Sequence, residues 1–187
     1  MDEAVTVSMV ETSAEAHEAA ALLGRIWSSP RPIVPADLLF ALVRVRNYAA
    51  LARVGPEVVG ASVAIRGVSG GGSPLLHSHV TGTTRPGVGR ILKEHQRQWA
   101  LAEGLPTITW TVDPLLRRNA VFNLDVLGAR VDGYRVNHYG SMTDGRNSGE
   151  ESDRFCVVWD LDPASPAGAL PAGEAPTMGR PARPSPE

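Results

Sequence analysis

The sequence predicts an α/β fold with a mixed sheet flanked by helices, and three patterns lead to that prediction. Two β-branched and apolar runs, residues 48–54 and 58–65, are separated by a Gly-Pro-Glu turn and form a hairpin. A strand-like segment, residues 75–82, passes through a Gly- and Pro-containing turn into a helix. Another strand, residues 107–112, follows that helix. Because a helix crosses over between them, the last two strands should be parallel neighbours.

The remaining elements follow from the same periodicities, taken along the chain. Residues 5–10 alternate as a first strand, and Thr12 with Glu15 forms a capping box for the next helix. A second helix opens near Pro35. A helix over 117–127 ends at Gly128, and strands 130–134 and 154–160 enclose a long polar loop over 137–153. The predicted apolar helix faces are Ala16, Ala19, Leu23 and Ile26; Leu38, Leu39, Leu42 and Val43; and Ile91, His95, Trp99 and Ala102.

Composition limits the number of domains, the partners and the location that we expect for this protein. The 187 residues suit one domain, residues 1–162, followed by a Pro- and Ala-rich tail over 163–187 that we expect to be disordered. A net charge of -2 without a basic block argues against a nucleic-acid partner. No long apolar segment or signal peptide is evident, and Cys156 is the only cysteine, so we expect no membrane association and a cytoplasmic location.

The turn over residues 83–89 has the features of a phosphate-binding site. The first N–H groups of a helix lack partners inside it, and the helix dipole adds positive charge there. Gly87 and Gly89 would let a phosphate approach the backbone. A dinucleotide-binding fingerprint needs a third glycine, and a P-loop needs Gly-Lys-Ser or Gly-Lys-Thr, and both are absent. A phosphate cradle and a plain connecting turn remain the two interpretations.

Agreement with a known family extends well beyond this turn. The segments LHSHVTG, GVGRILKEHQRQWALAEGL, ITWTVDPLLRRNAVFNLDVLGA, NHYGSMTDGRN and SDRFCVVWDL follow one another in that order. Together, over about residues 5–161, they resemble one branch of the GNAT superfamily of acyl-CoA-dependent N-acyltransferases. The resemblance implies a central, mostly antiparallel sheet flanked by helices. It also implies acetyl-CoA or another acyl-CoA as cofactor, a small-molecule amine as acceptor, and a homodimer as a candidate assembly.

The resemblance also implies where the cofactor binds. In the family, the strand before the glycine turn binds pantetheine through its backbone, and the turn binds the CoA pyrophosphate. Thr84 stands where the family usually has Arg or Gln, and the segment that leads into the glycine turn is shorter than in the family. Arg85 or Arg90 would then supply the positive charge for the pyrophosphate. Asn119 either contacts the cofactor or caps its helix. The implied cofactor-binding residues are Val80, Thr81, Gly82, Arg85, Gly87, Val88, Gly89, Arg90, Asn119 and Asn123.

Amide formation from a thioester needs a neutral amine, a donor to the carbonyl oxyanion and an acid for the thiolate. In the family a gap between two strands, here residues 79–82 and 109–112, exposes backbone groups to the thioester, and an N–H near Val80 or Thr81 is the candidate oxyanion donor. His77 and His79 lie two apart on one strand and share a face. They are either proton acceptors or partly buried structural histidines, and without a third ligand we predict no metal site.

The family's usual tyrosine acid, one turn before the helix-ending glycine, is replaced here by Leu124. Tyr139, with His138 second, is the candidate substitute. The polar loop either forms an acceptor pocket or is a solvated loop, and the candidate acceptor-binding residues are Asp144, Arg146, Asp153 and Arg154. The sequence thus favours an N-acyltransferase, with acetyl as the first candidate acyl group. A catalytically degenerate GNAT-fold CoA-binding or regulatory protein is the alternative, because of the shortened turn and Leu124.

Overall fold

The computed structural model describes residues 4–140 and 152–161, which form one seven-stranded sheet in the order β1-β2-β3-β4-β5-β7-β6. The predicted tail over 163–187, and the candidate residues Asp144 and Arg146, lie outside the described residues. The elements are β1 (Val5–Met9), α1 (Ser13–Trp27), α2 (Ala36–Arg44), β2 (Tyr48–Val54), β3 (Glu57–Val68), β4 (Pro74–Thr83), α3 (Val88–Ala102), β5 (Thr107–Val112), α4 (Arg117–Ala120), a π-helix η1 (Val121–Val126), β6 (Arg130–Arg135) and β7 (Arg154–Asp160).

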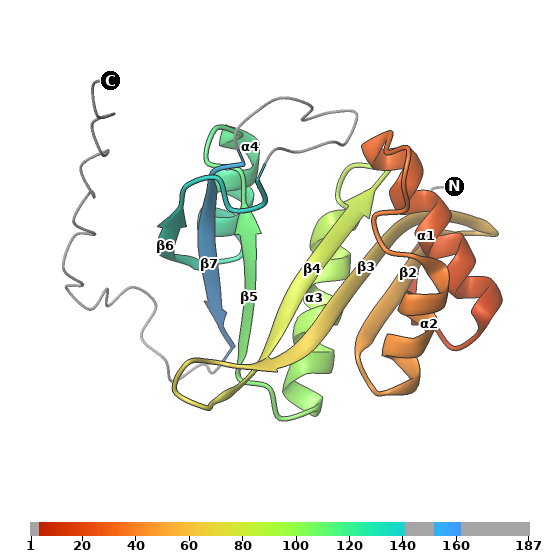
Figure 1. The fold of residues 1–187 in the computed structure, drawn as a ribbon. Helices are drawn as coiled ribbons and strands as arrows, with labels where there is room; N and C mark the ends of the chain where they lie inside the picture. Colours follow the sequence, from red (N-terminus) through yellow and green to blue (C-terminus); the bar gives the residue numbers. More distant parts are fainter. Residues whose placement is uncertain (1–3, 141–151, 162–187) are drawn as a thin grey trace, which may run out of the picture.

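The sheet is antiparallel except between β4 and β5, which confirms the predicted parallel pair. Helices α1 and α2 cover one face, and α3 covers the other (Figure 1). Successive side chains of β2 point to opposite faces of the sheet and belong to two hydrophobic cores. Ala49 and Leu51 pack toward α1 and α2, whereas Ala50 and Ala52 pack toward α3. None of the helices in the described parts of the chain is long and apolar enough to cross a membrane.

The first two helices begin where the sequence predicts. Thr12 accepts a hydrogen bond from the Glu15 N–H, and Glu15 accepts one from the Thr12 N–H, which completes the capping box of α1. Helix α2 follows Pro35. Its predicted apolar face was wrong at Leu38, which is 50% exposed, because α2 buries only Leu39 fully and packs Phe40 and Val43 beside it.

Helix α3 has the predicted bounds but buries a different face. The predicted stripe is wrong: Ile91 is 41% exposed and Ala102 is exposed, while His95 and Trp99 are half-buried against Tyr48. The side chains that face the sheet are Val88, Leu92, Lys93, Gln96 and Ala100. Two of them are polar, and they are buried because strand hydroxyls bond to them: Ser78 to Lys93 and Ser62 to Gln96.

The helix predicted over residues 117–127 is correct in position, but its second half is wound as a π-helix. Gly128, with φ of +71°, ends it as predicted. Inside the π-helix, Asn123 is buried and accepts a hydrogen bond from the indole N–H of Trp110 at 2.9 Å. This bond fixes η1 on the same face of the sheet as α3, since Trp110 belongs to the core that α3 covers.

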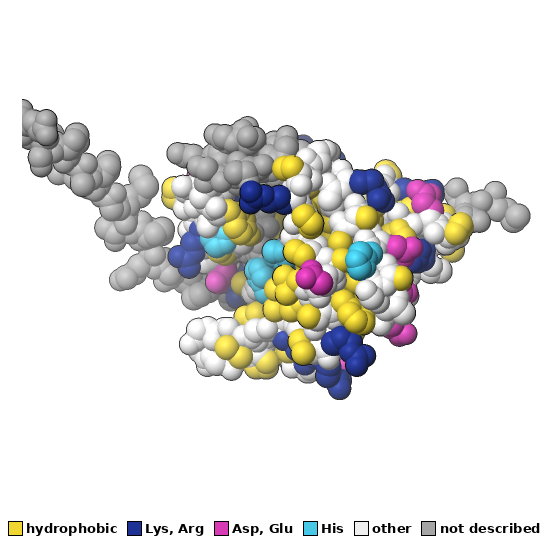
Figure 2. Space-filling view, turned by 45° about the vertical axis from the view of Figure 1, so that its right-hand side comes forward, with side chains coloured by type: hydrophobic (Ala, Val, Ile, Leu, Met, Phe, Trp, Pro, Cys, Tyr) yellow, Lys and Arg dark blue, Asp and Glu magenta, His cyan; other side chains and the backbone are white. Residues whose placement is uncertain are grey.

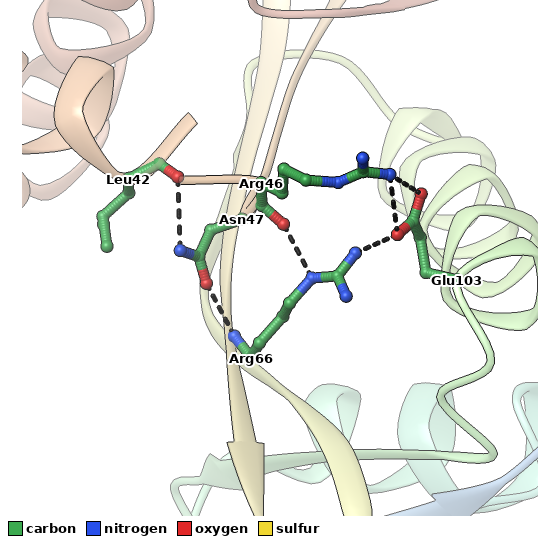
Figure 3. Close-up of polar contacts among 5 residues, drawn as sticks. All are labelled: Leu42, Arg46, Asn47, Arg66 and Glu103. Atoms are coloured by element: carbon green, nitrogen blue, oxygen red, sulfur yellow. Dashed lines mark hydrogen bonds and ion pairs between the residues drawn. The ribbon is translucent and has the colours of Figure 1, made fainter. Parts of the chain in front are cut away.

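A polar cluster joins the ends of α2, β3 and α3 (Figure 3). Glu103, just after α3, pairs with Arg46 and Arg66, and Arg66 also donates to the Arg46 carbonyl at 2.7 Å. Asn47 accepts from the Arg66 N–H and donates to the Leu42 carbonyl. The hydrogen bond from Arg66, with both arginine charges, lowers the pKa of Glu103. The cluster therefore contributes stability that is lost as the pH falls through this lowered pKa.

Gly60 in β3 allows α3 to approach the sheet closely. A Cβ atom there would lie 2.9 Å from both Leu92 Cδ1 and Val88 Cγ1, and 3.3 Å from Ala52 Cβ. We expect Gly60→Ala to lower the free energy of unfolding by about 1–3 kcal/mol through overpacking. Gly67→Ala, in the same strand, is the matched control, because its nearest contact would be an ordinary 3.5 Å. Equal urea midpoints for the two variants would contradict this packing.

Candidate active site

Strands β4 and β5 form a fork. They pair only at Leu76 with Ile108 and at His77 with Thr109. Beyond these pairs the two strands spread apart toward their C-terminal ends (Figure 1). On its other side β4 remains paired to β3, with a bulge that leaves His79 opposite no residue, between Ser78 and Val80. The backbone after His77 and after Thr109 is therefore free of ladder bonds between these two strands, as the resemblance implies for residues 79–82 and 109–112.

One side of the fork carries His77 and Tyr139. His77 Nδ1 lies 3.2 Å from Thr109 Oγ1, and the Tyr139 hydroxyl lies 2.8 Å from Thr111 Oγ1. Thr109 and Thr111 are two apart in β5, so they share a face. On the face shown in Figure 2, histidine side chains gather among apolar side chains. The structure thus brings His77 and Tyr139 to the same side of the fork.

The two strand histidines are held in the neutral form. Burial is the main cause that lowers the pKa of His77, and the nearby charges of His79, Lys93 and His138 lower it further. Partial burial also lowers the pKa of His79. A lowered pKa leaves the imidazole unprotonated at neutral pH, so it can accept a proton. Among the described residues, no three His, Cys, Asp or Glu side chains are grouped as metal ligands.

A short turn holds Tyr139 at the fork. Ser152 is fully buried, and its hydroxyl accepts the Tyr139 N–H at 2.8 Å and lies 2.9 Å from the Gly140 carbonyl. The Ser152 carbonyl accepts the N–H of His138. The guanidinium of Arg154 lies 5.5 Å from the centre of the Tyr139 ring. Sequence reasoning missed Ser152, because a single serine in a polar loop carries no pattern that marks it as buried.

The other side of the fork carries a buried polar network that sequence reasoning also missed. Lys93 Nζ donates to Ser78 Oγ at 2.8 Å and to Gln96 Oε1 at 3.2 Å. Gln96 donates to Ser62 Oγ, which lies 2.8 Å from Thr81 Oγ1. The burial of Lys93 lowers its pKa to about 7. The network therefore links an amine at the fork to Thr81, one of the two candidate oxyanion positions.

The turn before α3 has open space where a phosphate would sit. Gly87 has φ of +81° and precedes the first residue of α3, and a Cβ atom at Gly87 or Gly89 would meet nothing within 4 Å. Thr84 is tied to β3, since its N–H and hydroxyl both donate to the Val59 carbonyl. Arg85 pairs with Glu57. The backbone of the turn is thus anchored while the N-terminus of α3 stays uncovered by these side chains.

Two other predicted residues, Asn123 and Asp153, form hydrogen bonds within the structure. Asn123 donates its amide to the Asn119 carbonyl at 2.6 Å, in addition to its bond from Trp110. Asp153 accepts from the Tyr134 hydroxyl and from the Asn137 N–H, and the first of these is the main cause that lowers the pKa of Asp153. The side chains of Asn123 and Asp153 are therefore engaged in these bonds, whereas Arg154 lies against the Tyr139 ring.

Comparison with known proteins identifies the fold. Neither a family model nor a curated protein sequence matches this chain. Among solved structures, the ribosomal-protein-S18-alanine N-acetyltransferase of Escherichia coli matches with a TM-score of 0.67 at 16% identity, over 89% of this chain and 100% of that one. YncA of Salmonella typhimurium, solved with its cofactor acetyl-CoA, matches with a TM-score of 0.67 at 15% identity, over 89% and 99%. An acetyltransferase of the GNAT family from Streptococcus pneumoniae matches with a TM-score of 0.62 at 15% identity, over 83% and 98%. The chain has the GNAT fold, which confirms the resemblance at the level of the fold.

Removing the Ser152 hydroxyl should loosen the turn that positions Tyr139. Ser152→Ala removes the fully buried hydroxyl that accepts the Tyr139 N–H, so we expect the free energy of unfolding to fall by about 1–3 kcal/mol. Ser8→Ala, on the exposed face of β1, is the control and should change it by less than about 0.5 kcal/mol. Urea unfolding of both variants measures the difference. An unchanged midpoint for Ser152→Ala would show that this hydroxyl does not hold the turn.

Proposed function

We propose that this protein transfers an acyl group from an acyl-CoA to the amine of a small-molecule acceptor. The observation that carries this proposal is the position of the fork. It opens along β4, the strand that runs directly into the glycine turn and the N-terminus of α3. One ligand that carries phosphates at one end and a thioester at the other would satisfy both features, and CoA thioesters have that form. The GNAT fold supports the same class of reaction.

In this proposal the cofactor lies along β4. The phosphates bind the backbone N–H groups of residues 87–91, where the helix dipole favours an anion. Pantetheine amides bond to the free backbone of residues 80–82, as strand addition to an open edge would do. Arg90 contributes positive charge from the first turn of α3, and Arg85 contributes only if it releases Glu57.

The reaction then takes place between β4 and β5, where the two strands have separated. A neutral amine attacks the thioester carbon, and the oxyanion accepts a hydrogen bond from the N–H of Val80 or Thr81. His79 or His77 takes the proton that the amine nitrogen loses. The carbon–sulfur bond breaks, and Tyr139 gives its hydroxyl proton to the thiolate. An ordinary phenol has a pKa of about 10 and a thiol about 8.5, so this transfer is only slightly uphill.

Acceptor binding is assigned to the side of the fork that carries Tyr139. Arg154 lies against the Tyr139 ring and would attract a carboxylate of the acceptor. Asp144, Arg146 and Asp153 are the further candidates from the sequence. Among them, Asp153 would first have to give up the bonds from Tyr134 and Asn137.

The alternative is a GNAT-fold protein that binds CoA without catalysis. The observation that favours it is the bonding of Thr84 to the Val59 carbonyl, which leaves no side chain at that position to hold the pyrophosphate. Calorimetric titration with CoA and with acetyl-CoA, followed by an assay for free thiol with a panel of amines, separates the two functions. Binding without thiol release would favour the alternative, and no binding of either compound would contradict both.

Gly89 gives the clearest test of the phosphate site. Because the space around its Cβ position is open and its φ is ordinary, Gly89→Val should fold normally but should fill the space that a phosphate needs. We expect CoA binding to be lost in calorimetry while the melting temperature is kept. Gly70→Val is the matched control, since Gly70 also has open surroundings but lies in the β3–β4 loop. Unchanged CoA affinity in a folded Gly89→Val variant would remove the turn from the site.

Tyr139 gives the test of the acid. Tyr139→Phe should lower turnover by roughly 10²-fold or more and leave acyl-CoA affinity nearly unchanged, because only proton donation is removed. Tyr134→Phe is the control, since it removes a phenol hydroxyl that donates to Asp153. The rate of thiol release from acetyl-CoA with an accepted amine reports turnover. Full activity of Tyr139→Phe would exclude Tyr139 as the acid.

A further inference from the structure

The amine of Lys93 lies at the vertex of the fork, the point where β4 and β5 separate. Lys93 is only 5% exposed, and its Nζ lies 2.8 Å from Ser78 Oγ and 4.1 Å from the centre of the Trp110 ring. Ser78 and Trp110 are the residues that directly follow the last paired positions, His77 and Thr109. The side chain thus reaches from α3 to both strands at the point where they separate.

This amine has no acidic partner within the described part of the chain. Its polar contacts are the neutral oxygens of Ser78 and Gln96 and the face of Trp110. The neighbouring carboxylate, Glu94, is exposed and bonds to Gln98 and Arg97. A buried ammonium without an anion is costly, and burial accordingly lowers the pKa of Lys93 to about 7.

The choice of lysine is also unusual within this chain. Of the 18 Lys and Arg residues, Lys93 is the single lysine. An arginine stays charged in any protein environment, whereas a buried lysine can lose its proton when it has no anion and regain it when one arrives. A methionine of similar length would fill the same space without a charge to bury. These properties suit a group whose anionic partner is a ligand.

We propose that Lys93 binds a carboxylate at the far end of the acyl group, so that the acyl donor is a short dicarboxylic acyl-CoA, such as succinyl-CoA. The inference rests on the proposed function and names the acyl group that the GNAT fold leaves open. It replaces acetyl, the first candidate from the sequence, by an acyl group that carries its own negative charge.

The position of Lys93 along β4 fits such a group. The candidate oxyanion donor, Val80, lies just past the bulge at His79, and Ser78, which Lys93 contacts, lies just before it. Because their partners Val63 and Ala64 are adjacent in β3, the bulge brings Ser78 and Val80 closer together than two regular strand positions, which are roughly 6–7 Å. A succinyl group has three carbon–carbon bonds of about 1.5 Å each, and a charge-assisted hydrogen bond adds about 2.8 Å. With the thioester oxygen at Val80, an extended succinyl group is therefore long enough to span this part of β4, whereas an acetyl group carries no carboxylate for Lys93.

The charged and titratable groups around Lys93 do not supply this anion. From β4, His77 and His79 face the fork, and burial lowers the pKa of each. His138 also acts electrostatically on His77. The contacts from β5 and from within α3 are Trp110 and Gln96, which do not titrate. Each of these groups is neutral or cationic, so an incoming carboxylate would have Lys93 as its partner at the vertex.

Calorimetry with the full-length protein tests the inference without a known acceptor. Succinyl-CoA should bind roughly 10- to 100-fold more tightly than butyryl-CoA, which has the same chain length and no carboxylate. At pH 8, where Lys93 is mostly neutral, succinyl-CoA binding should also take up a proton, because pairing with the carboxylate raises the pKa of Lys93. Titrations in two buffers of different ionisation enthalpy measure that proton.

Lys93→Met should erase both the preference and the proton uptake, and should keep butyryl-CoA affinity and the melting temperature. Lys93→Gln serves if the methionine variant does not fold. Arg97→Gln removes another cation of α3, one that pairs with Glu94, and should keep the preference. Equal affinities for succinyl- and butyryl-CoA in the unmodified protein, or a preference that survives in Lys93→Met, would overturn the inference. If neither ester binds, the proposed function itself fails.

Discussion

The separation of β4 from β5 is the constraint on which the rest of this structure depends. Parallel strands in the middle of a sheet normally continue their ladder, because buried backbone groups without partners are costly. Here the ladder stops after two pairs, and the bulge at His79 lets β4 follow β3 away from β5. The backbone groups beyond that point need another partner. A cofactor arm that carries its own amides would provide one, which is why the fork is the natural site.

The two faces of the sheet give the fork two different environments. On one side, His77 contacts Thr109 and Tyr139 contacts Thr111 of the same strand, and the Ser152 turn holds Tyr139 in place. On the other side α3 packs so closely, over Gly60, that the Lys93 amine and the Gln96 amide replace apolar side chains at the sheet. His77 and the buried Lys93 amine therefore lie on different sides of the strands.

The sequence predicted the order of elements because each has a strong local signal, such as the capping box of α1 or the Gly-Pro turn before β3. It also predicted the parallel pair, since a helix between two strands imposes that arrangement. It failed on the buried face of α3, because periodicity counts Lys93 and Gln96 as exposed, and only the strand hydroxyls explain their burial. The bulge at His79, the π-helix and the role of Ser152 depend on tertiary contacts, so no local pattern predicts them.

A crystal structure of the protein with bound CoA tests the central claim most directly. We expect the pantetheine arm between β4 and β5, its amides bonded to the backbone of β4, and the pyrophosphate on the N–H groups of residues 87–91. The fork should widen no further, because it is already open in the structure described here. The contrary result would place CoA elsewhere, for example in the hollow of about 470 Å³ lined by Glu18, Arg25, Glu57 and Thr84, with the fork empty.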